Sequence, residues 1–169
     1  MSLTIETQKE ASFKIAKGDT PHIDSWENQV TYFDEPKGTA FEHYWFQKLE
    51  YILWKHGDKT DEKLKRYRIT SKNSVEHVHP QNEEYKNQMI QECLDAFGNL
   101  VLLSPGENSS YSNQAILKKH ADFHSKPRYD SLKLKVLFEA YENSGMQWGN
   151  KEIAKHQSKM LDLLKLHYQ

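Results

Sequence analysis

The feature that most limits what this chain can fold into is a pair of short strand-like segments separated by a helical pattern. The first segment covers residues 74–77, and the second is the apolar run at residues 99–104, bounded by Gly98 and a Pro-Gly pair. Between them, residues 83–97 carry apolar side chains at the three- and four-residue spacing of a helix. The pattern therefore predicts one β-hairpin that is split in sequence by an inserted helix.

Helical periodicity dominates the rest of the chain. Apolar residues recur at three- and four-residue spacing in residues 40–56, 130–141 and 149–167, with charged residues between them. These three segments are expected to be amphipathic helices. The sequence thus predicts an α+β fold class, in which a mostly helical domain contains a small hairpin-plus-helix unit.

The segments that flank the split hairpin are shorter. Residues 58–66 mix basic and acidic side chains and are expected to form a solvated loop, and residues 67–70 alternate like a strand. After the second strand, a turn is expected at residues 105–108. A further helix is then expected to begin at Ser109 or Ser112, since serine is a common N-cap residue.

Residues 1–38 are polar and contain several residues that interrupt helices and strands. They are expected to form an N-terminal arm or linker, and residues 39–169 the folded domain. Aromatic residues within the arm should anchor it to that domain: Trp26, Tyr32 and Phe33.

Composition excludes several classes of protein. A formal net charge of -1 over 169 residues means that any nucleic-acid binding must come from local clusters of Lys and Arg. The single cysteine, Cys93, cannot form an internal disulfide or a Cys-rich zinc site, and its apolar helical surroundings indicate a core residue. No apolar run reaches the ~18 residues of a membrane span, and no signal peptide is visible. A cytoplasmic protein without a membrane partner is expected.

The split hairpin also carries residues suited to hydrolysis. Glu76 and His77 place a carboxylate next to an imidazole, and Asn99 and Asn108 bracket the second strand. Phosphodiester hydrolysis needs an activated water and neutralisation of developing charge, which one histidine and one divalent ion can supply. Carboxylate and amide oxygens suit Mg²⁺. Because neighbouring side chains on a strand point to opposite faces, Glu76 and His77 can serve one centre only at a kink or strand end, for which Pro80 is a candidate.

These motifs resemble the HNH-type (ββα-metal) C-terminal domain of GmrSD-family, modification-dependent restriction endonucleases. The resemblance is carried by residues 76–81 (EHVHPQ), 98–104 (GNLVLLS) and 108–113 (NSSYSN). It implies a ββα-metal centre embedded among helices and a Mg²⁺- or Mn²⁺-dependent DNA endonuclease activity that restricts foreign or modified DNA.

The resemblance further implies the partners. In that family, nucleotide hydrolysis belongs to a separate domain, and this sequence has no Gly-rich phosphate-binding loop. DNA and an N-terminal nucleotide-hydrolysing domain or subunit are therefore the expected partners. We also consider that the chain is a fragment of a longer protein. A homodimer is also considered, because double-strand cutting by one such centre needs two copies or two visits.

Each matching residue acquires a role from the resemblance. His77 corresponds to the general base and Glu76 to the acidic metal ligand. Asn108 corresponds to the distal metal ligand, and Asn99 to the asparagine that braces the histidine loop. Asn113 corresponds to a supporting asparagine, although the choice of distal ligand between Asn108 and Asn113 stays open.

Several other residues have two interpretations. His79 either faces solvent or substrate or is a second metal ligand. Lys118 and Lys119 either form a solvated helix face or contact phosphate. His120 and His124 lie four residues apart, as zinc ligands on a helix do, but the sequence shows no carboxylate at a clear spacing, so a zinc site is not expected there.

The chain departs from the family pattern in three respects. The insertion between the strands is long and helical, the cysteines that hold a structural zinc in many HNH proteins are absent, and His156 stands where an arginine is expected. The rival interpretation is a catalytically inactive nucleic-acid-binding or scaffold module that retains the HNH fold. The near-neutral net charge favours this rival, whereas the complete set of polar site residues favours the nuclease.

Overall fold

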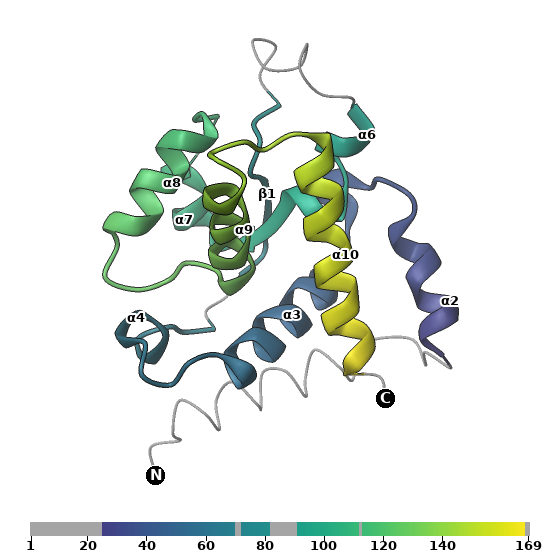
Figure 1. Cartoon of the computed structure of the whole chain (residues 1–169), viewed down its shortest axis with the longest axis horizontal. Coiled ribbons are helices and arrows are strands. Elements are labelled where there is room, and N and C mark those ends of the chain that lie inside the picture. Colours follow the sequence, from purple (N-terminus) through teal and green to yellow (C-terminus); the bar gives the residue numbers. More distant parts are fainter. Residues whose placement is uncertain (1–24, 70–71, 82–90, 112, 168–169) are drawn as a thin grey trace.

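The computed structural model of the protein describes residues 25–69, 72–81, 91–111 and 113–167. Its centre is an antiparallel sheet of two strands, β1 (Ser74–His77) and β2 (Leu100–Leu103), shown in Figure 1. Ser74 pairs with Leu103, and His77 pairs with Leu100. The two segments therefore form the split hairpin that the sequence predicts.

The inserted segment between the strands is described in part. Residues 82–90, which the sequence assigns to a helix, lie outside the described residues. The described part of the insertion contains α6 (Gln91–Leu94) and the short 3-10 helix η3 (Phe97–Asn99), which leads directly into β2.

Both faces of the sheet are covered, which explains the continuous apolar run of β2. All four residues of β2 are buried. Leu100 and Leu102 belong to one core together with Val75 of β1, whereas Val101 and Leu103 belong to a second core. A strand buried on both faces cannot show the apolar-polar alternation of a half-exposed strand.

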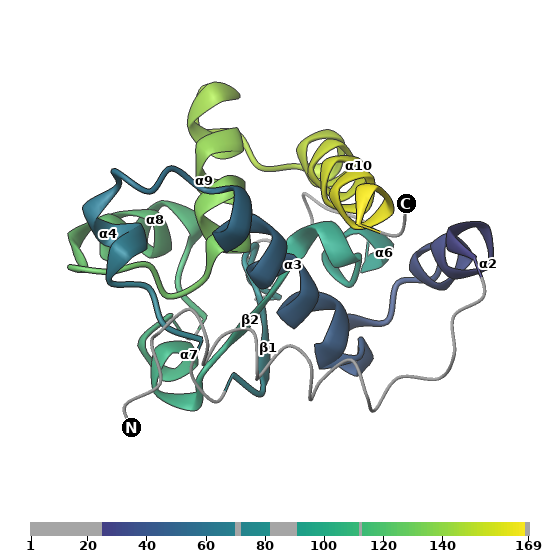
Figure 2. The ribbon, with the colours of Figure 1, turned by 90° about the horizontal axis from the view of Figure 1, so that it is seen from below.

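Five helices supply most of the two cores. The first core contains residues of α3 (His43–His56) and α10 (Asn150–Leu166). The second contains residues of α7 (Pro105–Tyr111), α8 (Ile116–Ser125) and α9 (Leu132–Asn143). Seen from below in Figure 2, the strands run through the middle, with α7 and α8 on one side and α10 on the other.

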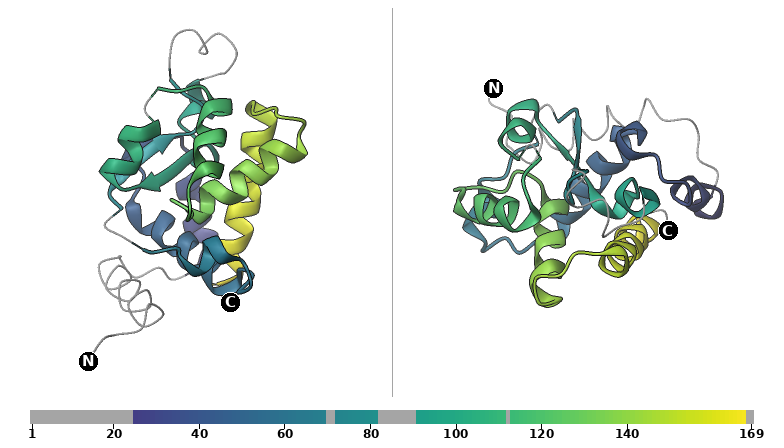
Figure 3. Two further views of the ribbon diagram at one scale, coloured as in Figure 1. Left: turned by 90° about the vertical axis from the view of Figure 1, so that its left-hand side faces the viewer. Right: turned by 90° about the horizontal axis from the view of Figure 1, so that it is seen from above.

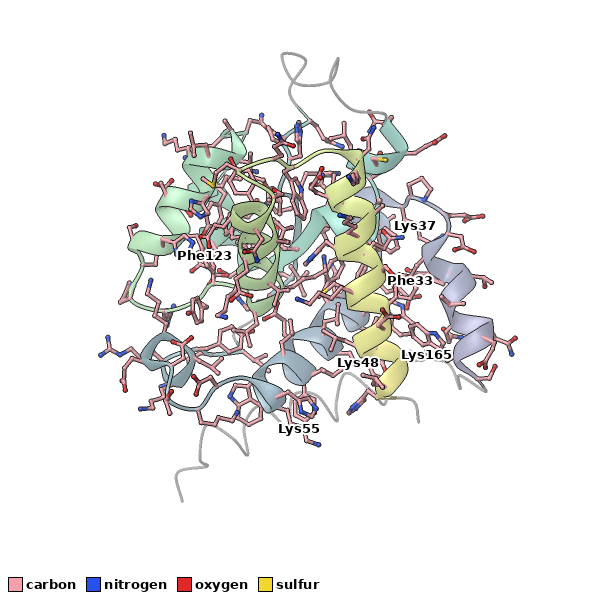
Figure 4. The ribbon with its side chains drawn as sticks, viewed as in Figure 1. Phe33, Lys37, Lys48, Lys55, Phe123 and Lys165 are labelled. Atoms are coloured by element: carbon pink, nitrogen blue, oxygen red, sulfur yellow. The ribbon has the colours of Figure 1, made fainter. Side chains whose placement is uncertain are left out.

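Two phenylalanines illustrate these cores in Figure 4. Phe33 lies between α10 and α2, and Phe123 lies on α8 at the opposite side of the molecule. Each is almost completely buried, with 2% and 0% of its surface exposed. The sheet is therefore the layer between two separate apolar clusters, and polar side chains of β1 must fit into one or the other side.

The N-terminal described segment is part of the packed structure. It contains α2 (Trp26–Val30) and the 3-10 helices η1 (Thr31–Phe33) and η2 (Gly38–Ala40). Trp26 and Phe33 belong to the first core. This part of the expected arm is thus attached to the domain, while the boundary between residues 38 and 39 stays a prediction.

The three long helices agree with their sequence patterns. The segments at residues 40–56, 130–141 and 149–167 correspond to α3, α9 and α10, and helices predominate over the small sheet, in agreement with an α+β class. None of the helices in the described parts of the chain combines the length and the apolar character needed to span a membrane.

Two expectations for residues 58–70 are wrong. The expected loop at residues 58–66 contains the short helix α4 (Glu62–Lys65), whose N-cap residue Asp61 accepts hydrogen bonds from the first-turn amides. Residues 67–69 form no strand, and residue 70 lies outside the described part. Tyr67 is fully buried instead, and its hydroxyl donates to the Glu50 carboxylate at 2.5 Å. Burial of this side chain takes precedence over the local strand propensity.

The expected turn at residues 105–108 is the first turn of α7. The Glu107 carboxylate accepts from the Ser104 amide at 2.8 Å, and the Ser104 hydroxyl accepts from the Glu107 amide at 3.3 Å. This reciprocal pair is a capping box, and Pro105 occupies the first helical position, where proline is favoured. The helix consequently begins directly after β2, and the chain forms a β-β-α unit.

Candidate functional site

Glu76 lies on the side of β1 that faces α8. Its Oε1 accepts a hydrogen bond from Lys119 Nζ at 2.7 Å, and the same Nζ donates to the backbone oxygen of His77 at 2.7 Å. Lys119 is only 2% exposed, so its interpretation as part of a solvated helix face is wrong. Burial lowers the pKa of Lys119, and the Glu76 carboxylate counteracts this effect. Lys118, in contrast, is exposed.

Asn108 reaches the same face of β1 from α7. Its Nδ2 donates to Ser74 Oγ at 2.6 Å. Ser74 and Glu76 are two residues apart on a strand and hence share a face, about 7 Å apart along it. The amide oxygen of Asn108 and the carboxylate of Glu76 are therefore hard-oxygen donors on one face, whereas Asn113 is exposed in the turn after α7.

His77 projects from the opposite face, as strand alternation requires. Its Nε2 lies 2.8 Å from Asp95 Oδ1, and Gln81 Nε2 donates to the same oxygen at 3.1 Å. Gln91 Nε2 donates to the other carboxylate oxygen of Asp95 at 2.7 Å. Gln81 Nε2 also lies 3.1 Å from His77 Nε2, but the contact with Asp95 is shorter. Because an ionised carboxylate only accepts hydrogen bonds, the Asp95 contact assigns the proton of a neutral His77 to Nε2 and its lone pair to Nδ1.

Asp95 is the site residue that sequence reasoning missed. Burial by itself would raise the pKa of Asp95, but the hydrogen bonds from Gln91, His77 and Gln81 together outweigh burial and lower it. The Asp95 backbone oxygen also accepts from the amide of Gly38 at 2.9 Å. In the sequence, Asp95 is one carboxylate on the polar side of a helical pattern, and no spacing rule relates it to a histidine 18 residues earlier.

Gly38 makes room for this carboxylate. Its φ is +52°, in the left-handed region that favours glycine, and a Cβ built there would lie 2.8 Å from Asp95 Oδ1. The approach of η2 to the Asp95–His77 pair consequently depends on the absence of a side chain at this position.

Asn99 ties the segment after β1 to three other parts of the chain. Its Oδ1 accepts from the His79 amide at 2.9 Å and from Trp148 Nε1 at 3.1 Å, while its Nδ2 donates to the Leu94 carbonyl at 2.9 Å. The side chain is fully buried. Asn99 thereby fixes the bend that begins one residue beyond His77.

A buried lysine fixes the backbone on either side of Asn99. Lys133 Nζ donates to the Phe97 carbonyl at 2.8 Å and to the Leu100 carbonyl. Lys133 is 0% exposed, and burial lowers its pKa to about 7, although the Glu50 carboxylate opposes this shift. A neutral amine retains two N–H groups, one for each of the two carbonyls.

His79 occupies a buried position, which differs from the expected solvent- or substrate-facing one. It is 7% exposed, and its Nδ1 lies 3.2 Å from the Pro80 carbonyl. Burial is the main cause that lowers the pKa of His79; the contact with Pro80 acts against it and the Lys119 charge acts with it. The imidazole is therefore neutral at neutral pH.

A second set of possible metal ligands lies on α8 and α9. His120, His124 and Glu142 each offer one ligand atom, and these atoms lie within 4.8 Å of one another. The sequence shows no carboxylate at a clear spacing from the two histidines and therefore predicts no zinc site, whereas the structure supplies Glu142 from a different helix. This contact depends on how α8 packs against α9, which residue spacing does not reveal.

The Glu76 face fits a hard divalent ion by its chemistry. It offers one carboxylate and one neutral amide oxygen, from Glu76 and Asn108, which are donors that Mg²⁺ and Mn²⁺ accept together with water and phosphate oxygens. The competing partner of the carboxylate is Lys119, which a bound cation would have to displace or share.

Comparison with known protein families assigns most of the chain to a family model. The family model described as GmrSD restriction endonucleases, C-terminal domain, matches residues 26–163. The match starts inside the expected N-terminal arm, at the first residue of α2. No curated protein and no solved structure matches the chain.

Proposed function

The chain belongs to the family of C-terminal domains of GmrSD restriction endonucleases, and we propose that it is a metal-dependent DNA endonuclease domain of a restriction system. The family implies endonuclease activity in restriction and a divalent metal cofactor. The HNH-type chemistry, the choice of Mg²⁺ or Mn²⁺ and the individual residue roles are our proposal.

The observation that carries the proposal is the arrangement around β1. Glu76 and Asn108 present oxygen donors on one face, and the adjacent His77 is oriented by a carboxylate on the other. In the proposal, Glu76 and Asn108 hold the ion. A bound divalent ion supplies a Lewis acid that polarises the scissile phosphate and stabilises charge on the leaving oxygen.

His77 is the proposed general base. With its Nε2 proton donated to Asp95, the free Nδ1 can accept a proton from the attacking water. The Asp95 carboxylate holds the imidazole in one orientation and stabilises the imidazolium that forms, as the carboxylate of a catalytic triad does. Asn99 holds the residues that follow His77 in place through its hydrogen bond with the His79 amide.

The proposal locates the scissile phosphate at the end of β1. The strand ends at His77, and the chain bends at Val78 and His79, so a phosphate beyond this end could be approached from both faces of β1. Contacts in a structure without substrate are often longer than in the reacting complex, so separation of the two side chains is compatible with catalysis.

One observation favours the inactive-module alternative. Glu76 is paired with Lys119, and His77 is paired with Asp95, so the charges of the centre are already balanced within the protein. A centre that no longer catalyses a reaction and only stabilises the fold would also have its charges paired within the protein. The near-neutral net charge of the chain also provides little general affinity for DNA.

A plasmid-nicking assay separates the two functions. The full chain, the His77→Ala variant and the control variant His56→Ala would be incubated with supercoiled plasmid, unmodified or carrying modified bases, with Mg²⁺, Mn²⁺ or EDTA. His56 is exposed at the end of α3, a helix that contributes none of the residues proposed for the β1 centre. Metal-dependent nicking by the parent and by His56→Ala, lost in His77→Ala, supports the nuclease. Equal nicking by all three, or none on any DNA, rejects it.

The proposed partners follow from the family. DNA is the substrate, and an N-terminal nucleotide-hydrolysing domain or subunit would act with this domain. A homodimer is proposed as the way to cut both strands with one centre per chain. Light scattering in the presence and absence of DNA measures this directly, and a monomer that converts nicked plasmid to linear DNA in a single turnover would contradict the homodimer.

A further inference from the structure

The helices α8 and α9 lie side by side in Figures 1 and 3. Three side chains with metal-ligating atoms, from these two helices, meet there. His120 Nε2 lies 2.7 Å from Glu142 Oε1, and His124 Nε2 lies 3.1 Å from the same oxygen. His120 and His124 are one helical turn apart on α8 and therefore share a face. Glu142 comes from the last turn of α9, so the group joins two helices.

The imidazole rings are held in place by aromatic neighbours. The ring centroid of His120 lies 5.2 Å from that of Phe138 and 5.7 Å from that of Tyr141, in edge-to-face geometry. The ring of His124 contacts Phe123 and Phe138 at 5.5 and 6.4 Å. Ligand side chains that are oriented by packing bind a metal with a smaller loss of conformational freedom.

We propose that His120, His124 and Glu142 form a binding site for a divalent transition-metal ion of the zinc class, separate from the hydrolytic centre at β1. Two imidazole nitrogens and one carboxylate oxygen are the ligand set of many three-ligand zinc sites, in which water takes the fourth position. Two histidines four residues apart on a helix, completed by an acidic ligand from another element, is a recurrent way to build such a site.

The two contacts between the histidines and the carboxylate require only a small adjustment. Ligand atoms around a tetrahedral zinc ion are about 3.3 Å apart, so the 2.7 Å and 3.1 Å His–Glu separations must widen by a few tenths of an ångström. The three ligand atoms all lie within 4.8 Å of one another. The Glu142 side chain is 45% exposed, so its carboxylate can shift by a few tenths of an ångström while the imidazole rings stay in place. The exposure of His124 and Glu142, 46% and 45%, also opens the site to an ion from solution.

The protonation of the group suits a cation. Burial, followed by the charge of His120, lowers the pKa of His124, which leaves its imidazole neutral. A hydrogen bond from His120 is the main cause that lowers the pKa of Glu142 and keeps it ionised. The positive charge of Lys63 acts against a cation at His124, but its Nζ donates to the backbone oxygen of His124 at 2.7 Å and is thus directed at the main chain.

A metal ion at this position would connect α8 to α9. Lys119, the residue directly before His120 on α8, pairs with Glu76 on β1. An ion that fixes α8 therefore also fixes the lysine beside the proposed hydrolytic metal ligand. This role is structural and needs no step of the hydrolysis reaction.

Zinc binding to the metal-stripped full chain tests the site by isothermal titration calorimetry and equilibrium dialysis. The parent, His56→Ala and Glu76→Gln should each bind one equivalent of Zn²⁺ with similar affinity. His124→Ala and Glu142→Ala should bind it at least about tenfold more weakly, since even the loss of residues that only support metal ligands costs 10- to 100-fold. Loss in Glu76→Gln with retention in His124→Ala would overturn the proposal, as would no binding by the parent.

A cobalt spectrum of the parent provides the independent measurement. Four-coordinate Co²⁺ with nitrogen and oxygen ligands gives intense visible absorption, whereas six-coordinate Co²⁺ among oxygen ligands gives weak absorption. Intense bands that persist in Glu76→Gln support the His120–His124–Glu142 site. Weak bands in the parent overturn it, whether or not the alanine variants fold.

Discussion

The hydrogen bond between Asp95 and His77 makes the proposed mechanism quantitatively testable through Asp95→Asn. The substitution preserves the shape of the side chain and removes the charge that faces Nε2 at 2.8 Å. A hydrogen bond to a charged group contributes about 1.5–3 kcal/mol. Because the Asp95 side chain is 25% exposed and water screens the pair, the lower half of this range applies. The nicking rate should then fall about 13- to 45-fold.

A matched control distinguishes this role from a general loss of charge or stability. The assay is single-turnover nicking at saturating metal, with Asp162→Asn on the exposed face of α10 as the matched control. An unchanged rate in Asp95→Asn, together with an inactive His77→Ala, would refute the orienting role.

Three further predictions concern the scaffold around the centre. Gly38→Ala should lower the unfolding free energy by about 1–2 kcal/mol, because the φ of Gly38 is +52°. Gly106→Ala should not lower it, since a Cβ added at Gly106 would have no neighbouring atom within 4 Å. Urea denaturation of the two variants measures the difference. Asn99→Ala should cost on the order of 3 kcal/mol in the same measurement, since it leaves several buried polar groups without a partner. Burial lowers the pKa of Lys133 to about 7, below the unfolded value near 10.4, so the unfolded state binds more protons between these values and stability should rise with pH across this window. Lys133→Met should abolish that rise in melting temperature between pH 7 and 10, and the exposed Lys118→Met should keep it.

The long helices and the split hairpin could be predicted because their signals are local. The helices α3, α9 and α10 bury one stripe each, which produces the three- and four-residue spacing of apolar residues. The strand β2 is short, apolar and bounded by Gly98 and Pro105. The family resemblance, which the match over residues 26–163 confirms, depends on the same local motifs.

A local signal was also overlooked at the start of α7. Ser104 and Glu107 have the spacing of a capping box, and Pro105 sits at the first helical position. Interpreting the Pro-Gly pair as a turn places the predicted start of the helix several residues too late. The error matters for the centre, because α7 carries Asn108 to Ser74 only if the helix follows β2 without an intervening turn.

The remaining features depend on contacts between distant segments. The burial of Lys119 follows from its pairing with a carboxylate 43 residues earlier, and the contact between His120 and Glu142 spans 22 residues. Charged residues are rarely buried without a partner, so a sequence pattern assigns such residues to the surface by default. Only the packing of α8 against β1 and α9 reveals which of them are internal.

The two covered faces of the sheet place a constraint on any mechanism at β1. Glu76 and His77 point to opposite faces of this strand and lie in different environments. Glu76 pairs with Lys119 of α8, and His77 pairs with Asp95, the residue after α6. Glu76 and His77 can act on one phosphate only beyond the end of the strand, because the sheet separates its two faces along the rest of β1. The position of that end is set by Asn99, which holds the His79 amide and is itself held by Trp148. The geometry of the proposed centre is consequently determined as much by this neutral, buried amide as by the residues that would touch the substrate.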